Sequence, residues 1–110
     1  MQRDLADKRK AWNKIFESLK GGGTDIQTWS LRDGYKNYFH AITRGTEIIV
    51  GCSENVPSCK IDPSRPIFYE DFERVADVYN QYITGEVKRQ DMTKKGWNTT
   101  YIISLIVRFL

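Results

Sequence analysis

The residues of this chain best suited to recognition chemistry gather near its C-terminal end. Four basic side chains fall within eight residues of one another, just ahead of two threonines that open an apolar segment. They are Lys88, Arg89, Lys94 and Lys95, followed by Thr99 and Thr100. Basic side chains and the amide groups at the start of a helix bind phosphate. The pattern therefore predicts contacts with nucleic-acid phosphates, which position a protein on a strand without reading its sequence.

The same region has the outline of a helix-turn-helix. Residues 88–95 are polar enough for a short helix, Gly96 supplies a turn, and residues 99–110 follow as a second helix. Met92 lies four positions ahead of the glycine, as the spacing requires, but it is not the small residue expected there. A recognition helix also needs side chains that reach base edges, and the second helix offers only Arg108.

The second helix of this pair is apolar on nearly every side. Ile102, Ile103, Leu105 and Ile106 point around most of its circumference, and a helix of this kind is usually buried. It is therefore the central core helix of the domain, half of a dimer interface, or a helix that reads DNA. We expect it to be covered by the rest of the molecule or by a second copy, and we predict a homodimer.

Other residues with chemical potential are too sparse for a catalytic site. His40 is the only histidine, and it lies within a run of strand-forming residues. An enzyme would need a cleft that joins His40 to Cys52 or to a carboxylate. His40, Cys52 and Cys59 do not make the closely spaced four-ligand set of a structural zinc site. The sequence predicts a protein that is not an enzyme and that has no catalytic residues, metal or cofactor.

Two amphipathic helices are predicted outside the C-terminal region. Apolar side chains recur at helical spacing over residues 4–20, and the three glycines at 21–23 end that helix. Residues 70–83 repeat the pattern with a wider apolar face, and Gly85 ends the second helix. Both are expected to pack on a sheet, although the basic face of the first helix also suits a membrane surface or a partner protein.

Strands are predicted between these two helices. Residues 38–43 and 46–52 form a hairpin with a glycine-containing turn, and residues 24–31 form an edge-like strand before it. Residues 59–61 are predicted as a short further strand, whereas residues 62–66, with two prolines, are predicted as a turn. The fold class is α+β. A single domain, 1–110, has an N-terminal helix, a short antiparallel β-meander and then three helices with a helix-turn-helix-like C-terminal pair.

The charge of the chain is unevenly distributed. The formal net charge is +3, in a chain of 110 residues that suits one domain. Residues 1–20 hold six basic and three acidic side chains, residues 21–87 hold six and ten, and residues 88–110 hold five and one. If the two basic ends meet in space, they form a face that attracts phosphate. The alternative is scattered, solvated charge.

Cysteine content and hydropathy indicate a cytoplasmic protein without a membrane segment. The chain has two cysteines and no apolar leader at its N-terminus. No window approaches the 18 uninterrupted apolar residues of a membrane-spanning helix. We expect cytoplasmic localisation with both thiols reduced.

The second half of the chain resembles a group of small bacterial proteins. The residues that carry the resemblance are the runs 61–67, 71–75 and 98–106. They resemble segments of uncharacterised proteins of bacterial mobile gene cassettes, of the integron cassette type, some of which accompany DNA-handling or defence genes. The resemblance rests on helix starts and apolar spacing, and it implies a bacterial cytoplasmic accessory protein. It assigns a role to no individual residue.

Two functions follow from these observations. The leading one is a non-enzymatic bacterial accessory or binding protein with weak nucleic-acid affinity through its basic C-terminal region. The residues predicted to bind are Lys88, Arg89, Lys94, Lys95, Thr99, Thr100 and Arg108. The alternative is a small-molecule or protein-binding homodimer, with a pocket lined by Trp29, Tyr38 and Phe39.

Overall fold

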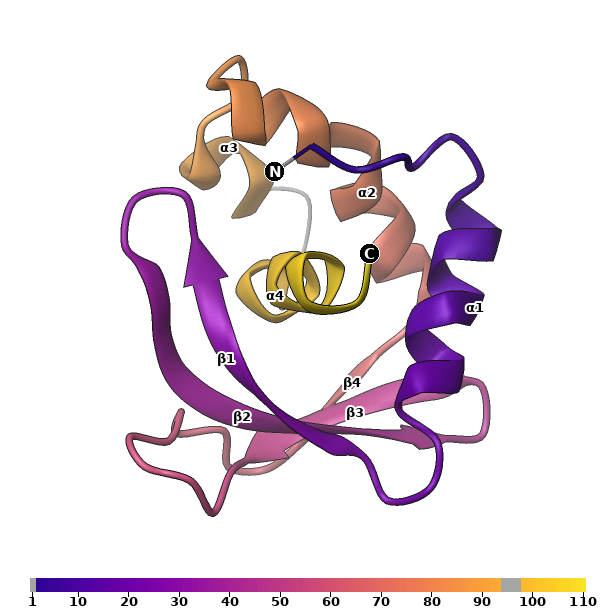
Figure 1. The fold of residues 1–110 in the computed structure, drawn as a ribbon, viewed down its shortest axis with the longest axis vertical. Helices are drawn as coiled ribbons and strands as arrows, with labels where there is room; N and C mark the ends of the chain where they lie inside the picture. Colours follow the sequence, from indigo (N-terminus) through magenta and orange to yellow (C-terminus); the bar gives the residue numbers. More distant parts are fainter. Residues whose placement is uncertain (1, 94–97) are drawn as a thin grey trace.

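The computed structural model describes residues 2–93 and 98–110 (Figure 1). Its elements are α1 (Lys8–Ser18), β1 (Thr24–Ser30), β2 (Gly34–Arg44), β3 (Glu47–Cys52), β4 (Arg65–Ile67), α2 (Tyr69–Thr84), α3 (Arg89–Thr93) and α4 (Thr99–Phe109). This order of elements confirms the predicted α+β class. None of the helices in the described part of the chain is both long and apolar enough to cross a membrane.

The four strands form the predicted antiparallel meander, in the order β1-β2-β3-β4. The sheet curls around α4, which lies in its concave side (Figure 1). A β-bulge between Gln27 and Trp29 interrupts the pairing of β1 with β2. The pairing places Thr28 alone opposite Lys36 and Asn37, so the extra residue lies in β2. Thr28 and Trp29 are both buried, so burial does not alternate strictly along β1.

The last strand lies elsewhere than the sequence predicts. The predicted strand at residues 59–61 is wrong: β4 falls at Arg65–Ile67, where it overlaps the end of the segment 62–66 predicted as a turn. Pro66 pairs with Ile49 of β3. A proline is tolerated there because β4 is an edge strand, so no further strand needs the missing N–H donor.

The α4 helix is the centre of the hydrophobic core. Ile102, Ile103, Leu105 and Ile106 are each at most 1% exposed. The sheet covers one side of the helix, and α1 and α2 cover much of the rest (Figure 1). The prediction that this helix is shielded is confirmed, and the shield is the chain itself. Its apolar character therefore does not require a second copy.

Polar side chains fix α4 and α2 against β1. The Ser104 hydroxyl accepts a hydrogen bond from the Trp29 N–H at 2.9 Å and donates to the Thr100 carbonyl at 2.7 Å. The Leu31 N–H, just after β1, donates to the Tyr82 hydroxyl at 2.8 Å. These contacts satisfy backbone donors that the bulge and the strand end would otherwise leave without a partner.

Candidate anion-binding site

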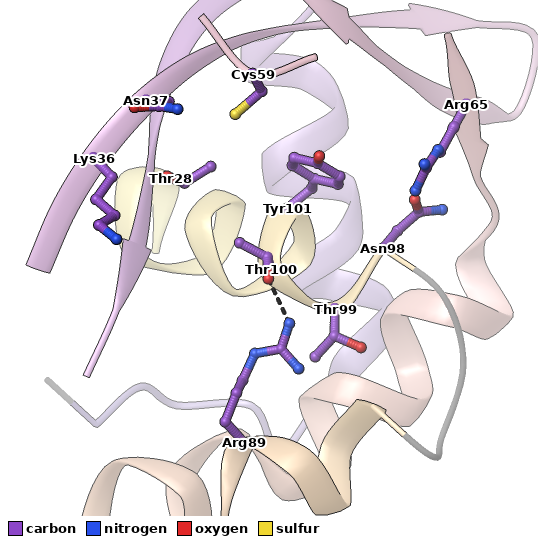
Figure 2. A pocket seen from close by; sticks show the side chains of 10 residues that line it. All are labelled: Thr28, Lys36, Asn37, Cys59, Arg65, Arg89, Asn98, Thr99, Thr100 and Tyr101. Atoms are coloured by element: carbon purple, nitrogen blue, oxygen red, sulfur yellow. Dashed lines mark hydrogen bonds between the residues drawn. The ribbon is translucent and has the colours of Figure 1, made fainter. Parts of the chain in front are cut away.

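A polar recess lies where the start of α4 meets the open edge of the curved sheet. It encloses about 390 Å³, and Figure 2 shows the side chains around it. The lining residues are Thr28, Lys36, Asn37, Cys59, Arg65, Arg89, Asn98, Thr99, Thr100 and Tyr101. We call it the Arg89 pocket. The described residues that line it include three cations and no carboxylate, so its electrostatic potential favours an anion.

Arg89 reaches the pocket from the first residue of α3. Its guanidinium points toward α4 and hydrogen-bonds the Thr100 hydroxyl oxygen (Figure 2). The side chain is half-buried, and this burial lowers the pKa of Arg89 from its ordinary value. An arginine nevertheless stays protonated at neutral pH. A guanidinium already held in place loses little conformational entropy when it binds an anion in the fork geometry suited to phosphate.

Two further cations come from the sheet. Arg65 extends from β4 on the side of Asn98 (Figure 2), and no carboxylate among the described residues pairs with it. Lys36 extends from β2, and its Nζ lies 3.5 Å from a carboxylate oxygen of Asp33. Both side chains are exposed. They can therefore move toward a ligand, and Lys36 would exchange a weak surface ion pair for it.

The start of α4 adds the partial positive charge of a helix N-terminus. Asn98 is the N-cap residue, with a positive φ of 68°, and its side chain makes no hydrogen bond to the first helical turn. Its Nδ2 instead donates to the Pro66 carbonyl at 3.2 Å, while its Oδ1 is buried with no recorded partner among the described residues. That oxygen can accept a hydrogen bond from a ligand that carries a donor beside its anionic group.

Tyr101 and Cys59 form the less polar wall. The Tyr101 ring lies 5.1 Å from the ring of Phe39, measured between centroids. Burial raises the pKa of the Tyr101 phenol and of the Cys59 thiol. Both groups are therefore neutral donors at neutral pH, and no negative charge from this wall opposes an anion.

The structure brings some of the predicted binding residues together and separates others. Arg89, Thr99 and Thr100 line the same pocket. Lys88 is exposed and borders a neighbouring shallow hollow. Arg108 lies at the opposite end of α4, where its guanidinium carbon is 5.2 Å from the centre of the Phe109 ring. The predicted contacts at Lys94 and Lys95 lie outside the described residues.

Several lining residues were missed by sequence reasoning. The largest omissions are Lys36, Arg65 and Asn98, which come from β2, β4 and the residue before α4. Arg65 stands in a segment predicted as a turn, and Lys36 stands in one left outside the predicted hairpin. Only the strand register and the curl of the sheet bring these two side chains to the start of α4. The polar type of Asn98 at a helix start was the one available signal.

Among the described residues, the basic side chains of α1 do not join those around the Arg89 pocket. The α1 and α3 helices lie on opposite sides of α4 (Figure 1). The Lys8 ammonium pairs with Asp77 at 2.9 Å, and Arg9 stacks 3.6 Å above the centre of the Tyr69 ring. The basic residues of α1 therefore act locally, and the positive potential around the Arg89 pocket comes from α3, β2 and β4.

His40 lies in a second hollow, of about 340 Å³, with Asp25, Cys52 and Glu54. Its Nδ1 is 3.0 Å from Asp25 Oδ1, so a cleft does join the histidine to carboxylates and a cysteine. The recorded hydrogen bonds of the Cys52 thiol go to the backbone of Ile61 instead of to the imidazole. Among the described residues, no group of three or more His, Cys, Asp or Glu side chains is placed to hold a metal ion.

The aromatic residues of the alternative prediction mainly fill the core. Phe39 is fully buried and Trp29 is 8% exposed, and both belong to the hydrophobic cluster around α4. Tyr38 is half-buried on β2.

Comparisons of the chain with models of known protein families, with curated proteins and with solved structures gave no match.

Proposed function

We propose that this protein is a non-enzymatic binding protein whose Arg89 pocket receives a phosphate group of a single-stranded nucleic acid. One observation carries the proposal: Lys36, Arg65 and Arg89, from three separate elements, converge at the start of α4 with no carboxylate among the described lining residues. Side-chain cations combined with a helix N-terminus are a recurrent way of binding phosphate.

The burial of α4 favours a single strand over a duplex. A recognition helix must enter the major groove, but Ile102–Val107 lie inside the domain. The helix-turn-helix-like pair is therefore proposed as a phosphate-binding corner and not as a reader of base edges. A flexible single strand can place one phosphate or its own end in a recess, whereas the regular, stiff backbone of a duplex cannot bend a single phosphate into it.

A sugar hydroxyl beside the phosphate would suit the buried Asn98 Oδ1. This acceptor has no recorded partner in the described structure, and leaving a buried polar atom unpaired costs about 1–3 kcal/mol. A ribose offers more hydroxyl donors near its phosphates than a deoxyribose does. We therefore expect RNA to bind more tightly than DNA of the same sequence.

Fluorescence anisotropy with labelled oligo-U and oligo-dT tests the proposal. Arg89→Gln removes a charge-assisted contact of about 1.5–3 kcal/mol, so affinity should fall about tenfold or more. The salt dependence of binding should also decrease by about one phosphate contact. Lys10→Gln is the matched control, because Lys10 is exposed on α1, away from the pocket.

Two results would contradict the proposal. One is the absence of any binding tighter than about 100 μM at physiological salt, the weak limit of non-specific affinity. The other is an equal loss of affinity in the Arg89 and Lys10 variants, because the pocket would then contribute no more than general surface charge.

The pocket volume favours a second candidate, a small molecule that carries phosphate or carboxylate. About 390 Å³ falls within the usual range of small-molecule sites. Thermal-shift measurements with uridine monophosphate and oligo-U separate the two functions. If the mononucleotide stabilises the protein as much as the oligonucleotide does at the same concentration, the small-molecule function is supported and the strand-binding function is not.

Homodimerisation and an accessory role in the bacterial cytoplasm remain part of the proposal. Because α4 is covered by its own chain, a dimer would have to use another surface. Leu31 and Tyr35 are exposed by 47% and 60% beside the β1–β2 turn. Analytical ultracentrifugation of the wild type and of Leu31→Glu would test whether this surface joins two copies.

A further inference from the structure

The sheet register brings the two cysteines to the same edge of β2. Cys52, the last residue of β3, pairs with Phe39. The pairing with β3 ends at Phe39, and residues 57–59 pair with the next residue of β2. The Tyr38 N–H donates to the Pro57 carbonyl at 2.8 Å, and the Cys59 N–H donates to the Tyr38 carbonyl at 2.7 Å. This segment runs parallel to β2, whereas β3 runs antiparallel to it. Cys59 is therefore directed toward the position that Cys52 occupies.

Contacts across the loop between the cysteines support the same placement. The Ser53 N–H donates to the Ser58 hydroxyl at 2.9 Å, so the residues just inside the two cysteines touch. The Cys52 Sγ lies 3.4 Å from both the N and the O of Ile61, only two residues beyond Cys59. Burial raises the pKa of Cys59, and the charge of a Cys52 thiolate adds to this effect.

We propose that Cys52 and Cys59 are a redox-sensitive pair that closes reversibly to an intramolecular disulfide around residues 53–58. Both are free thiols in the structure. The hydrogen bonds of Tyr38 with Pro57 and Cys59, and of Ser53 with Ser58, already order the chain around the two cysteines, so closing the ring orders little additional chain. No ligand is needed for this step, and the proposed disulfide does not depend on what the Arg89 pocket binds.

The accessibility of the two thiols sets the order of the chemistry. Cys52 is exposed and lines the open hollow that it shares with His40. Cys59 is half-buried, and burial raises the pKa of its thiol, so it is the slower first nucleophile. The Cys52 thiolate attacks one sulfur of a small disulfide reagent, a new S–S bond forms, and one reagent thiolate leaves.

The second step consumes the mixed disulfide. Cys59 loses its proton to solvent and attacks the Cys52 sulfur, and the second reagent thiolate leaves and takes up a proton. Two protein thiols are oxidised by two electrons, and one reagent disulfide is reduced to two thiols. Because Cys59 also lines the Arg89 pocket, oxidation removes a thiol donor from the pocket wall.

The folded protein can be tested with 2-hydroxyethyl disulfide. This reagent is uncharged, so Asp25 and Glu54 in the hollow do not repel it. Intact mass should show wild-type protein lighter by two hydrogen atoms, with no reagent attached and no free thiol left to alkylate. Cleavage after Glu54 should then give two peptides, one with Cys52 and one with Cys59, that stay joined by the disulfide until it is reduced.

Single variants distinguish ring closure from independent reaction of the two thiols. Cys59→Ser should stop at a mixed disulfide on Cys52, and Cys52→Ser should react more slowly with the reagent than Cys59→Ser does. The inference is overturned if the wild type keeps both thiols free, carries two reagent groups or forms covalent dimers. Because no ligand takes part, these outcomes are separate from any failure of nucleic-acid binding.

Discussion

Replacing Ser104 with alanine tests how α4 is fixed in the curved sheet. The Ser104 side chain is 1% exposed, and its hydroxyl accepts the hydrogen bond of the Trp29 N–H at the β-bulge. Alanine at this position removes one oxygen atom and leaves a buried backbone donor without its partner. The substitution changes the side-chain volume very little, so its effect reports mainly on the hydrogen bond.

The expected loss of stability follows from three contributions. A buried donor that loses its partner costs about 1–3 kcal/mol. Alanine is a better helix former than serine, which returns up to about 0.5 kcal/mol. The hydrogen bond from the Ser104 hydroxyl to the Thr100 carbonyl is lost as well. This loss costs little, because a carbonyl within a helix also accepts the backbone N–H four residues later. The free energy of unfolding should therefore fall by about 0.5–2.5 kcal/mol.

Urea denaturation and amide hydrogen exchange provide the measurements. Ser104→Ala should lower the urea midpoint with an unchanged m-value, and it should lower the melting temperature by about 2 °C or more. Exchange of the Trp29 amide should accelerate more than that of its neighbours in β1. The specific loss of protection at Trp29 distinguishes a broken hydrogen bond from a general loosening of the fold.

Ser18→Ala is a matched control. The Ser18 hydroxyl also donates to the carbonyl four residues earlier, at 2.8 Å, but on the exposed side of α1. Its replacement should be neutral, or should stabilise the protein by up to about 0.5 kcal/mol. If Ser104→Ala costs no more than Ser18→Ala and the Trp29 amide stays protected, the contact does not anchor α4 to the sheet.

Three further predictions concern the turn before β1, alkaline pH and the pocket wall. Gly23→Ala should destabilise the protein by about 1 kcal/mol or more beyond Gly22→Ala in urea denaturation, because both glycines have positive φ but only at Gly23 would a Cβ collide with the backbone of β2. Burial raises the pKa of Tyr79 above 10.0, so the unfolded chain loses this proton first and stability falls as pH rises past that value; Tyr79→Phe should make the fall in melting temperature from about pH 9 to 11 shallower. If the proposed function is correct, oligo-U should slow alkylation of Cys59, which lines the pocket, and leave that of exposed Cys52 unchanged.

The hydrophobic pattern predicted the helices and the central hairpin because their periodicity reflects burial directly. The apolar faces of residues 70–83 and 99–110 became α2 and the core helix α4. The hairpin of 38–43 with 46–52 was found, although β2 extends back to Gly34. Local periodicity was insufficient at β4, because three residues with a proline carry too little pattern to distinguish an edge strand from a turn.

The candidate site was predictable only where its residues are close in sequence. Arg89 and Thr100 stand 11 residues apart and were grouped from the sequence. Lys36 and Arg65 reach the same pocket from two strands of the curved sheet that are not neighbours, the inner strand β2 and the edge strand β4. Their placement depends on the register shift between β1 and β2 and on the curl of the sheet, which no short-range pattern encodes.

The position of α4 links the stability of the fold to the geometry of the candidate site. The same helix fills the core with its middle residues and presents its first turn to the pocket. The Ser104 hydroxyl hydrogen-bonds both the Thr100 carbonyl in the first turn of α4 and the Trp29 N–H in β1. A shift of α4 along its axis would therefore displace Thr100 from Arg89 as well as break the anchor to β1. Ser104→Ala should accordingly weaken oligo-U binding while the cations of the pocket remain, whereas Arg89→Gln should weaken binding because it removes one of those cations. If Ser104→Ala lowers stability without any change in affinity, the core and the pocket are uncoupled, and the first turn of α4 does not contribute to binding.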